Sequence, residues 1–101
     1  MQEITPKDLR QKLEKKKLVK LLDVREPYEN KEYNIGGVLI PLGELLSRLN
    51  ELEEFKNNEV VVYCKSGNRS QMAQHLLVNA GFEEVFNLKG GMEAWKKEFD
   101  A

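Results

Sequence analysis

Cysteine is nearly absent from this chain of 101 residues, and the single one, Cys64, cannot form an internal disulfide. Long apolar runs are missing too, because none approaches the roughly 20 residues that a membrane-spanning helix requires. The first residues, Met1 to Ile4, lack the basic and apolar regions of a secretory signal peptide. These absences predict a protein of the reducing cytoplasm with no membrane contact.

An excess of charge of either sign is also lacking. Lys and Arg number 16 and Asp and Glu 17, so the formal net charge is −1, which argues against nucleic acid as a partner. The three lysines at 15–17 are interpreted as balancing the partial negative charge at the C-terminal end of a helix. The length fits one domain, residues 1–101, with a single core.

Apolar and polar residues alternate along the chain in a way that predicts strands and helices in turn. A proline after Thr5 and leucines at helical spacing predict a first helix over 6–16. The other predicted segments are strands at 19–24, 38–40, 60–63 and 85–88, and helices at 42–52, after residue 70 as far as Gly81, and at 92–99. Such alternation predicts an α/β fold with a parallel sheet covered by helices on both faces.

Cys64 lies where the strongest strand signal, 60–63, ends and a polar loop leading to a helix begins. Backbone N–H groups of such a loop and the helix N-terminus attract negative charge. Lys65 and Arg69 add two positive charges, so we expect Cys64 to be a reactive thiolate. The alternative is a small buried hydrophobic residue, which is the more common role of a lone cysteine; the position after a strand favours the thiolate.

The loop that follows contains residues suited to a tight curl. Gly67 adopts backbone angles that other residues avoid, Asn68 tolerates a left-handed conformation, and Ser70 is expected to be the helix N-cap. An ordinary turn would have the same composition. The composition of the loop therefore indicates an anion site only because Cys64 precedes it.

A second polar cluster, Asp23 and Arg25, follows the predicted strand at 19–24 and so should lie at the same sheet edge as Cys64. We expect the Asp23 carboxylate to accept loop hydrogen bonds and orient Arg69, and Arg25 to pair with Glu26 or another acid. Weak exposed ion pairs are the alternative interpretation.

Three segments, 21–26, 62–70 and 87–95, together resemble a single-domain rhodanese, a sulfurtransferase. The resemblance covers nearly the whole chain and implies a three-layer fold with a mostly parallel five-stranded sheet. It further implies a persulfide on Cys64, support of the loop by Asp23 and Arg25, and attraction of the anion by Lys65 and Arg69. The donor would be held by the loop residues Lys65, Ser66, Gly67, Asn68, Arg69 and Ser70. No metal or organic cofactor is implied.

One segment departs from the family, because Tyr33-Asn34-Ile35-Gly36-Gly37-Val38 stands where Gly-His-Ile-Pro-Gly-Ala is usual. Loss of the proline predicts a more flexible edge without loss of chemistry. The only histidine, His75, falls in the helix after the loop and is interpreted as a surface or packing residue.

Four residues separate Cys64 from Arg69, whereas the loop of related phosphatases and arsenate reductases is one residue longer. A shorter loop favours sulfur over a phosphoryl group, and the lack of a second cysteine argues against an internally resolved arsenate reductase. The predicted function is transfer of a sulfane sulfur from thiosulfate or a similar anion to cyanide, a thiol or a protein. A sulfur relay or a binding module for a protein partner is the alternative, and we expect a monomer or weak dimer.

Overall fold

The computed structural model describes residues 2–100 and contains one five-stranded sheet in which the strands pair in parallel. The strands are β1 (Glu3–Ile4), β2 (Val19–Asp23), β3 (Val38–Leu39), β4 (Glu59–Tyr63) and β5 (Glu84–Leu88). Their order in the sheet is β1-β5-β4-β2-β3, which places β4 at the centre. The predicted α/β fold is confirmed, although β1, with only two residues, was not expected from the sequence.

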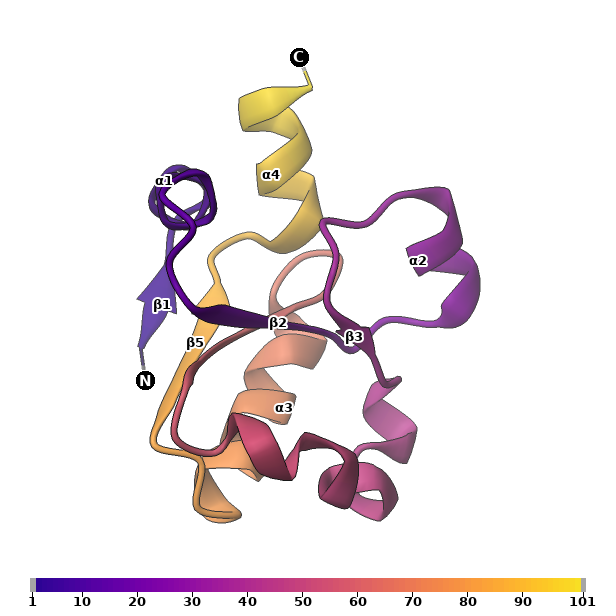
Figure 1. Ribbon diagram of the computed structural model, residues 1–101. Helices are drawn as coiled ribbons and strands as arrows, with labels where there is room; N and C mark the ends of the chain where they lie inside the picture. The colour runs from indigo at the N-terminus through magenta and orange to yellow at the C-terminus, as the bar shows by residue number, and fades with distance from the viewer. Residues whose placement is uncertain (1, 101) are drawn as a thin grey trace.

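Helices cover both faces of the sheet (Figure 1). The α-helices are α1 (Pro6–Glu14), α2 (Pro27–Glu32), α3 (Asn68–Asn79) and α4 (Gly91–Phe99), and two 3-10 helices are η1 (Leu42–Glu44) and η2 (Leu46–Phe55). α1 and α4 lie on one face, and α3 with η1 and η2 on the other. None of the helices within residues 2–100 has the length and apolar character needed to cross a membrane.

The central strand β4 is buried on both sides, which explains its continuous apolar sequence. Val60 and Val62 contribute to the core beneath α3, whereas Val61 and Tyr63 contribute to the core beneath α1 and α4. Side chains alternate between the faces along a strand, so a single run of residues supplies both cores. The residue that follows this rigid strand, Cys64, is therefore held firmly in place.

Several predicted boundaries shift. The first helix ends at Glu14 instead of 16, because Lys16 takes a left-handed conformation with φ 55° and closes the helix. The strand predicted at 19–24 ends at Asp23. The third helix ends at Asn79, and Gly81, with φ 98°, lies just beyond its C-cap residue.

The helix predicted over 42–52 is wrong in type, since the segment forms the 3-10 helices η1 and η2. Apolar residues here recur every three positions, as at Leu46, Leu49, Leu52 and Phe55. Three residues per turn is the period of a 3-10 helix, so this spacing brings Leu49, Leu52 and Phe55 against the core, while Leu46 at the start of η2 is exposed. Arg48, whose φ is −120°, interrupts the helical backbone.

The segment after β2 was predicted only to end that strand, but it forms the short helix α2. Pro27 occupies the first turn, where its missing N–H costs no hydrogen bond. Glu26 is the N-cap, and the Glu29 side chain accepts from the Glu26 N–H at 3.0 Å. This capping box fixes α2 beside the carboxyl end of β2.

Candidate active site

Cys64, Asp23 and Asn87 meet at the carboxyl edge of the sheet, where β4, β2 and β5 end. Cys64 follows β4 directly, and a three-residue bend leads to α3. The N-cap of α3 is Gly67, with φ 107°, a conformation that glycine adopts without strain. The loop thus turns back over the sulfur of Cys64.

The Cys64 sulfur is buried, with the residue 1% exposed, and is surrounded by donors. The backbone N–H groups of Gly67 and Ser70 point at Sγ from 3.1 and 3.3 Å, and the Ser70 Oγ lies 3.2 Å away. Burial raises the pKa of the thiol, but hydrogen bonds from Ser70, Gly67 and Ser66 outweigh burial and leave the pKa below its ordinary value. This is the environment of a nucleophilic thiolate.

Ser70 is not the N-cap predicted from the sequence, because α3 already begins at Asn68. Its position in the first turn places both its N–H and its hydroxyl oxygen beside the Cys64 sulfur. The hydroxyl donates its proton to Oδ1 of Asn87 at 2.6 Å, and Nδ2 of Asn87 donates to the Gly67 carbonyl at 3.1 Å. Sequence reasoning did not single out Asn87, although a polar amide next to buried Leu88 in a strand was a signal.

The first turn of α4 holds the other side of the loop. The N–H of Met92 donates to the Cys64 carbonyl at 2.8 Å, and that of Glu93 to the Lys65 carbonyl at 2.9 Å. Gly91, with φ 61°, permits this approach, since a Cβ there would lie 2.5 Å from the Cys64 oxygen. The carbonyls of Cys64 and Lys65 therefore face α4, while the N–H groups of Gly67 and Ser70 face the sulfur.

Asp23 and Arg25 form a buried ion pair beneath the site, with Nη2 2.8 Å from Oδ2 and Nε 2.9 Å from Oδ1. Asn30 donates to the same carboxylate at 2.9 Å, and Arg25 donates to the Tyr33 carbonyl at 2.7 Å. The prediction that Asp23 and Arg25 lie at the same sheet edge as Cys64 is confirmed. The prediction that Asp23 orients Arg69 is wrong, because its hydrogen bonds go to Arg25 and Asn30.

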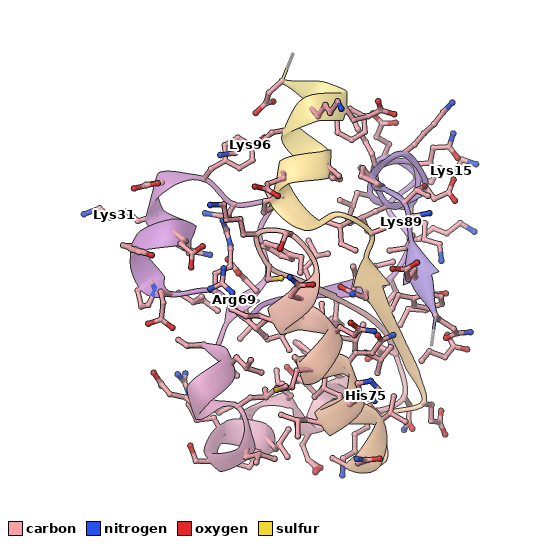
Figure 2. The ribbon with its side chains drawn as sticks, turned by 180° about the vertical axis from the view of Figure 1, so that it is seen from behind. Lys15, Lys31, Arg69, His75, Lys89 and Lys96 are labelled. Carbon is pink, nitrogen blue, oxygen red and sulfur yellow. The ribbon has the colours of Figure 1, made fainter. Side chains whose placement is uncertain are left out.

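Arg69 is oriented by Glu29 of α2, whose two carboxylate oxygens accept from Nη1 and Nη2 at 2.8 and 2.9 Å. Hydrogen bonding to Arg69 lowers the pKa of Glu29 to about 2. Figure 2 shows Arg69 at the start of α3 on the side facing α2, with His75 further along the same helix. The sequence missed this role of Glu29 because α2 itself was missed.

An open groove with a cavity volume of about 290 Å³ borders the loop, between α2 and the start of α4. Lys65 and Lys96 bring positive charge to it, and Glu32 and Glu93 bring negative charge. Lys65 takes part in no ion pair among residues 2–100. The groove is thus the open surface beside the Cys64 loop.

The remaining predicted residues lie at the surface. Ser66 and Asn68 are exposed in and beside the loop, and His75 is exposed on α3, as expected. Asn34 donates to the Asn30 carbonyl and accepts from the Gly36 N–H, both at 2.9 Å, which closes the turn that departs from the family pattern. Within the described residues, no three His, Cys, Asp or Glu side chains are placed to share a metal ion.

Comparison with known families identifies the class of this chain. The family model described as "Rhodanese-like domain" matches residues 5–98. A crystal structure of a rhodanese-related protein from Thermoplasma volcanium superposes with a TM-score of 0.86 at 29% identity, covering 98% of this chain and 94% of that one. The chain therefore belongs to the rhodanese-like domain family, and the predicted fold of that family is confirmed.

Several relatives carry names that refer to sulfur. A protein of Allochromatium vinosum named "Sulfurtransferase" is 36% identical over 96 residues, which cover 94% of this chain and 88% of that protein. "Putative sulfur carrier protein YrkF" of Bacillus subtilis is 42% identical over 94 residues, which cover 92% of this chain. The match spans only 50% of YrkF, so this chain corresponds to half of that protein.

Proposed function

We propose that this protein is a sulfurtransferase that carries a sulfane sulfur as a persulfide on Cys64, with thiosulfate or a similar small anion as donor. The observation that carries the proposal is the pair of backbone N–H groups, from Gly67 and Ser70, that point at a buried Sγ from 3.1 and 3.3 Å. Two fixed donors stabilise negative charge on sulfur before and during transfer. The names of the relatives in the family agree with this chemistry.

The reaction has two displacements at divalent sulfur. The Cys64 thiolate attacks the outer sulfur of thiosulfate, a sulfur–sulfur bond forms, and sulfite leaves with the electron pair of the broken bond. A cyanide ion or thiolate then attacks the outer sulfur of the persulfide, and Cys64 leaves as a thiolate. The residues that act on the anion are Lys65, through its positive charge, and the loop amides of residues 65–70.

The burial of Cys64 favours sulfur over phosphate. The residue is 1% exposed, so a slender terminal sulfur reaches Sγ more easily than the phosphorus of an ester, which is surrounded by four oxygens. The Arg69 guanidinium is bound to Glu29 through two hydrogen bonds and is therefore not free to clamp a phosphoryl group. A sulfur relay to a protein acceptor uses the same persulfide and differs only in the second step.

Mass spectrometry of the intact protein tests the proposal. Incubation with thiosulfate should add the mass of one sulfur atom, cyanide should remove it with formation of thiocyanate, and Cys64→Ser should show neither change. The matched control is His75→Gln, an exposed change on α3 that should load sulfur like the wild type. Absence of the adduct, or hydrolysis of an aryl phosphate by the wild type but not by Cys64→Ser, would contradict the proposal.

A further inference from the structure

The hydroxyl of Ser70 has one proton and two neighbours that can accept it. Its Oγ lies 2.6 Å from Oδ1 of Asn87 and 3.2 Å from Sγ of Cys64. All three residues are at most 4% exposed, so water does not readily replace a missing partner. The direction of the Ser70 O–H bond therefore affects the energy of the sulfur.

The Gly67 carbonyl fixes this direction. A carbonyl oxygen only accepts, so the amide group of Asn87 must turn Nδ2 toward the Gly67 oxygen, at 3.1 Å. Oδ1 of Asn87 then faces Ser70, and because Oδ1 also only accepts, the Ser70 proton points at Asn87. The Ser70 oxygen is left to face Sγ with a lone pair, which suits a sulfur that carries a proton.

Ionisation of Cys64 requires a different arrangement. When the thiol proton leaves to solvent, the thiolate is an acceptor, and Ser70 stabilises it only by turning its O–H from Asn87 to Sγ. Oδ1 of Asn87 then loses its donor in a buried site, which is costly. Formation of a persulfide makes Sγ an uncharged divalent sulfur and a weak acceptor again, so the Ser70 proton returns to Asn87.

We propose that Asn87 is a positioning residue that holds the Ser70 hydroxyl proton whenever the Cys64 sulfur is uncharged and releases it to the thiolate. Asn87 thereby favours the thiol and the persulfide over the thiolate, and it tunes how readily Cys64 is loaded and discharged. This inference rests on the proposed sulfur chemistry, yet the equilibrium it describes exists without any donor.

Ultraviolet titration of the thiolate tests the inference, because Cys64 is the only cysteine and the Cys64→Ser spectrum can be subtracted. Asn87→Leu removes the competing acceptor and should lower the pKa of Cys64 by about one unit, since Ser70 is then free to donate to sulfur. Asn87→Asp should not lower it, because an ionised carboxylate takes the Ser70 proton more strongly, and a protonated one keeps the Asn87 pattern by donating to the Gly67 carbonyl and accepting from Ser70. A loosened fold would instead change the pKa in the same direction in both variants.

A double-mutant cycle assigns the effect to Ser70. Ser70→Ala should raise the pKa of Cys64, and in that background Asn87→Leu should no longer lower it. The Gly67 carbonyl retains a bond from the Gln71 N–H at 3.1 Å when the Asn87 amide is removed, so the loop keeps one anchor. The charged groups on the surrounding elements, Lys65, Arg69, Glu93 and the Asp23–Arg25 pair, stay unchanged in these variants.

Gln74→Leu is the control, because the Gln74 side chain also links α3 to β5, through the Val85 carbonyl at 2.9 Å, and its other hydrogen bond goes to the Gln2 carbonyl. It should leave the pKa of Cys64 unchanged. A pKa in Asn87→Leu equal to or above that of the wild type would overturn the inference. If Asn87→Leu does not fold, Asn87→Asp decides, and a lowered pKa of Cys64 would overturn it. Failure of thiosulfate loading in the wild type would instead refute the proposed function and leave this titration valid.

Discussion

Glu29 and Arg69, forty positions apart in the sequence, form a two-point ion pair with distances of 2.8 and 2.9 Å. The pair joins α2 to the first turn of α3, so it fixes the end of the Cys64 loop from outside the loop. The Glu29 side chain is 16% exposed and that of Arg69 is 35% exposed. Arg69 thus acts in this structure as an anchor of the loop.

Glu29→Gln should destabilise the protein by about 1–2 kcal/mol near neutral pH, because the charge of Glu29 strengthens its bonds to Arg69. The folded-state pKa of Glu29, about 2, lies below its unfolded value, so this stability is present above the unfolded pKa. It is lost as the pH falls from about 4.5 through about 2. Urea unfolding of both proteins across this range measures the difference, which should shrink on acidification.

The control for this variant is Glu32→Gln on the same helix, an exposed residue that forms no ion pair within residues 2–100. It should change the free energy of unfolding by less than about 0.5 kcal/mol. A Glu29→Gln difference that stays constant down to pH 2 would show that the ion pair does not contribute as described.

Asp23→Asn should destabilise the fold by about 3–5 kcal/mol, because it leaves the buried Arg25 guanidinium without a counter-charge. The Asp23 side chain is 0% exposed and that of Arg25 is 5% exposed. Glu14→Gln, in the exposed Arg10–Glu14 pair, should cost less than about 0.5 kcal/mol. Chemical denaturation compares the two, and equal losses would argue against a special role for the buried pair.

Gly91→Ala should disturb the Cys64 loop without touching the sulfur. The new Cβ would lie 2.5 Å from the Cys64 oxygen and 2.6 Å from the Lys65 oxygen, and φ is 61°. We expect the free energy of unfolding to fall by about 1–3 kcal/mol. We also expect persulfide formation to be at least about tenfold slower. Gly43→Ala is the matched control, since nothing lies within 4 Å of its Cβ. Normal loading of Gly91→Ala by thiosulfate would contradict the expected coupling.

Tyr63→Phe should remove a stabilising contribution that depends on alkaline pH. The Tyr63 hydroxyl donates to the Gly36 carbonyl at 2.9 Å, and burial raises its pKa to about 12. This pKa lies above the unfolded value, so the contribution, about 1 kcal/mol, is complete below pH 10 and declines as the pH rises through about 12. Denaturation between pH 8 and 12 measures it, and a difference that grows with pH would have the wrong sign.

Lys65→Gln should raise the KM for thiosulfate about threefold to tenfold and change kcat little, because Lys65 lines the groove beside the loop and forms no ion pair within residues 2–100. Lys31→Gln removes a charge from the outer side of α2 and should leave KM nearly unchanged; Figure 2 shows Lys31 pointing away from Arg69. Steady-state kinetics at two salt concentrations measures both variants. If both variants raised KM equally, the change would reflect the total charge of the protein and not the position of Lys65.

The sequence predicted the sheet and the position of Cys64 because both depend on local patterns. Four consecutive residues of β4 are buried, and the apolar run ends at the residue before Cys64. It did not predict α2, since a helix of six residues without buried side chains leaves no apolar stripe. It also misjudged η2, where a repeat of three was interpreted as a helical repeat of three and four.

Within the site, the sequence identified the loop but not the residues that hold it. Glu29, Asn87 and Gly91 reach the loop from three other elements, and no pattern along the chain relates such partners. Asp23 was expected to bind Arg69 because both were placed at one sheet edge. The structure instead gives each charge a nearer partner, Arg25 for Asp23 and Glu29 for Arg69.

The hydrogen bonds from Met92 and Glu93 to the loop carbonyls have a consequence for the energy of catalysis. The peptide group between Lys65 and Ser66 is held on both sides, because its carbonyl accepts from the Glu93 N–H and its own N–H bonds to the Cys64 sulfur. The dipole of this peptide group is therefore oriented when the protein folds, and the arrival or departure of a sulfur atom requires little reorganisation energy from it.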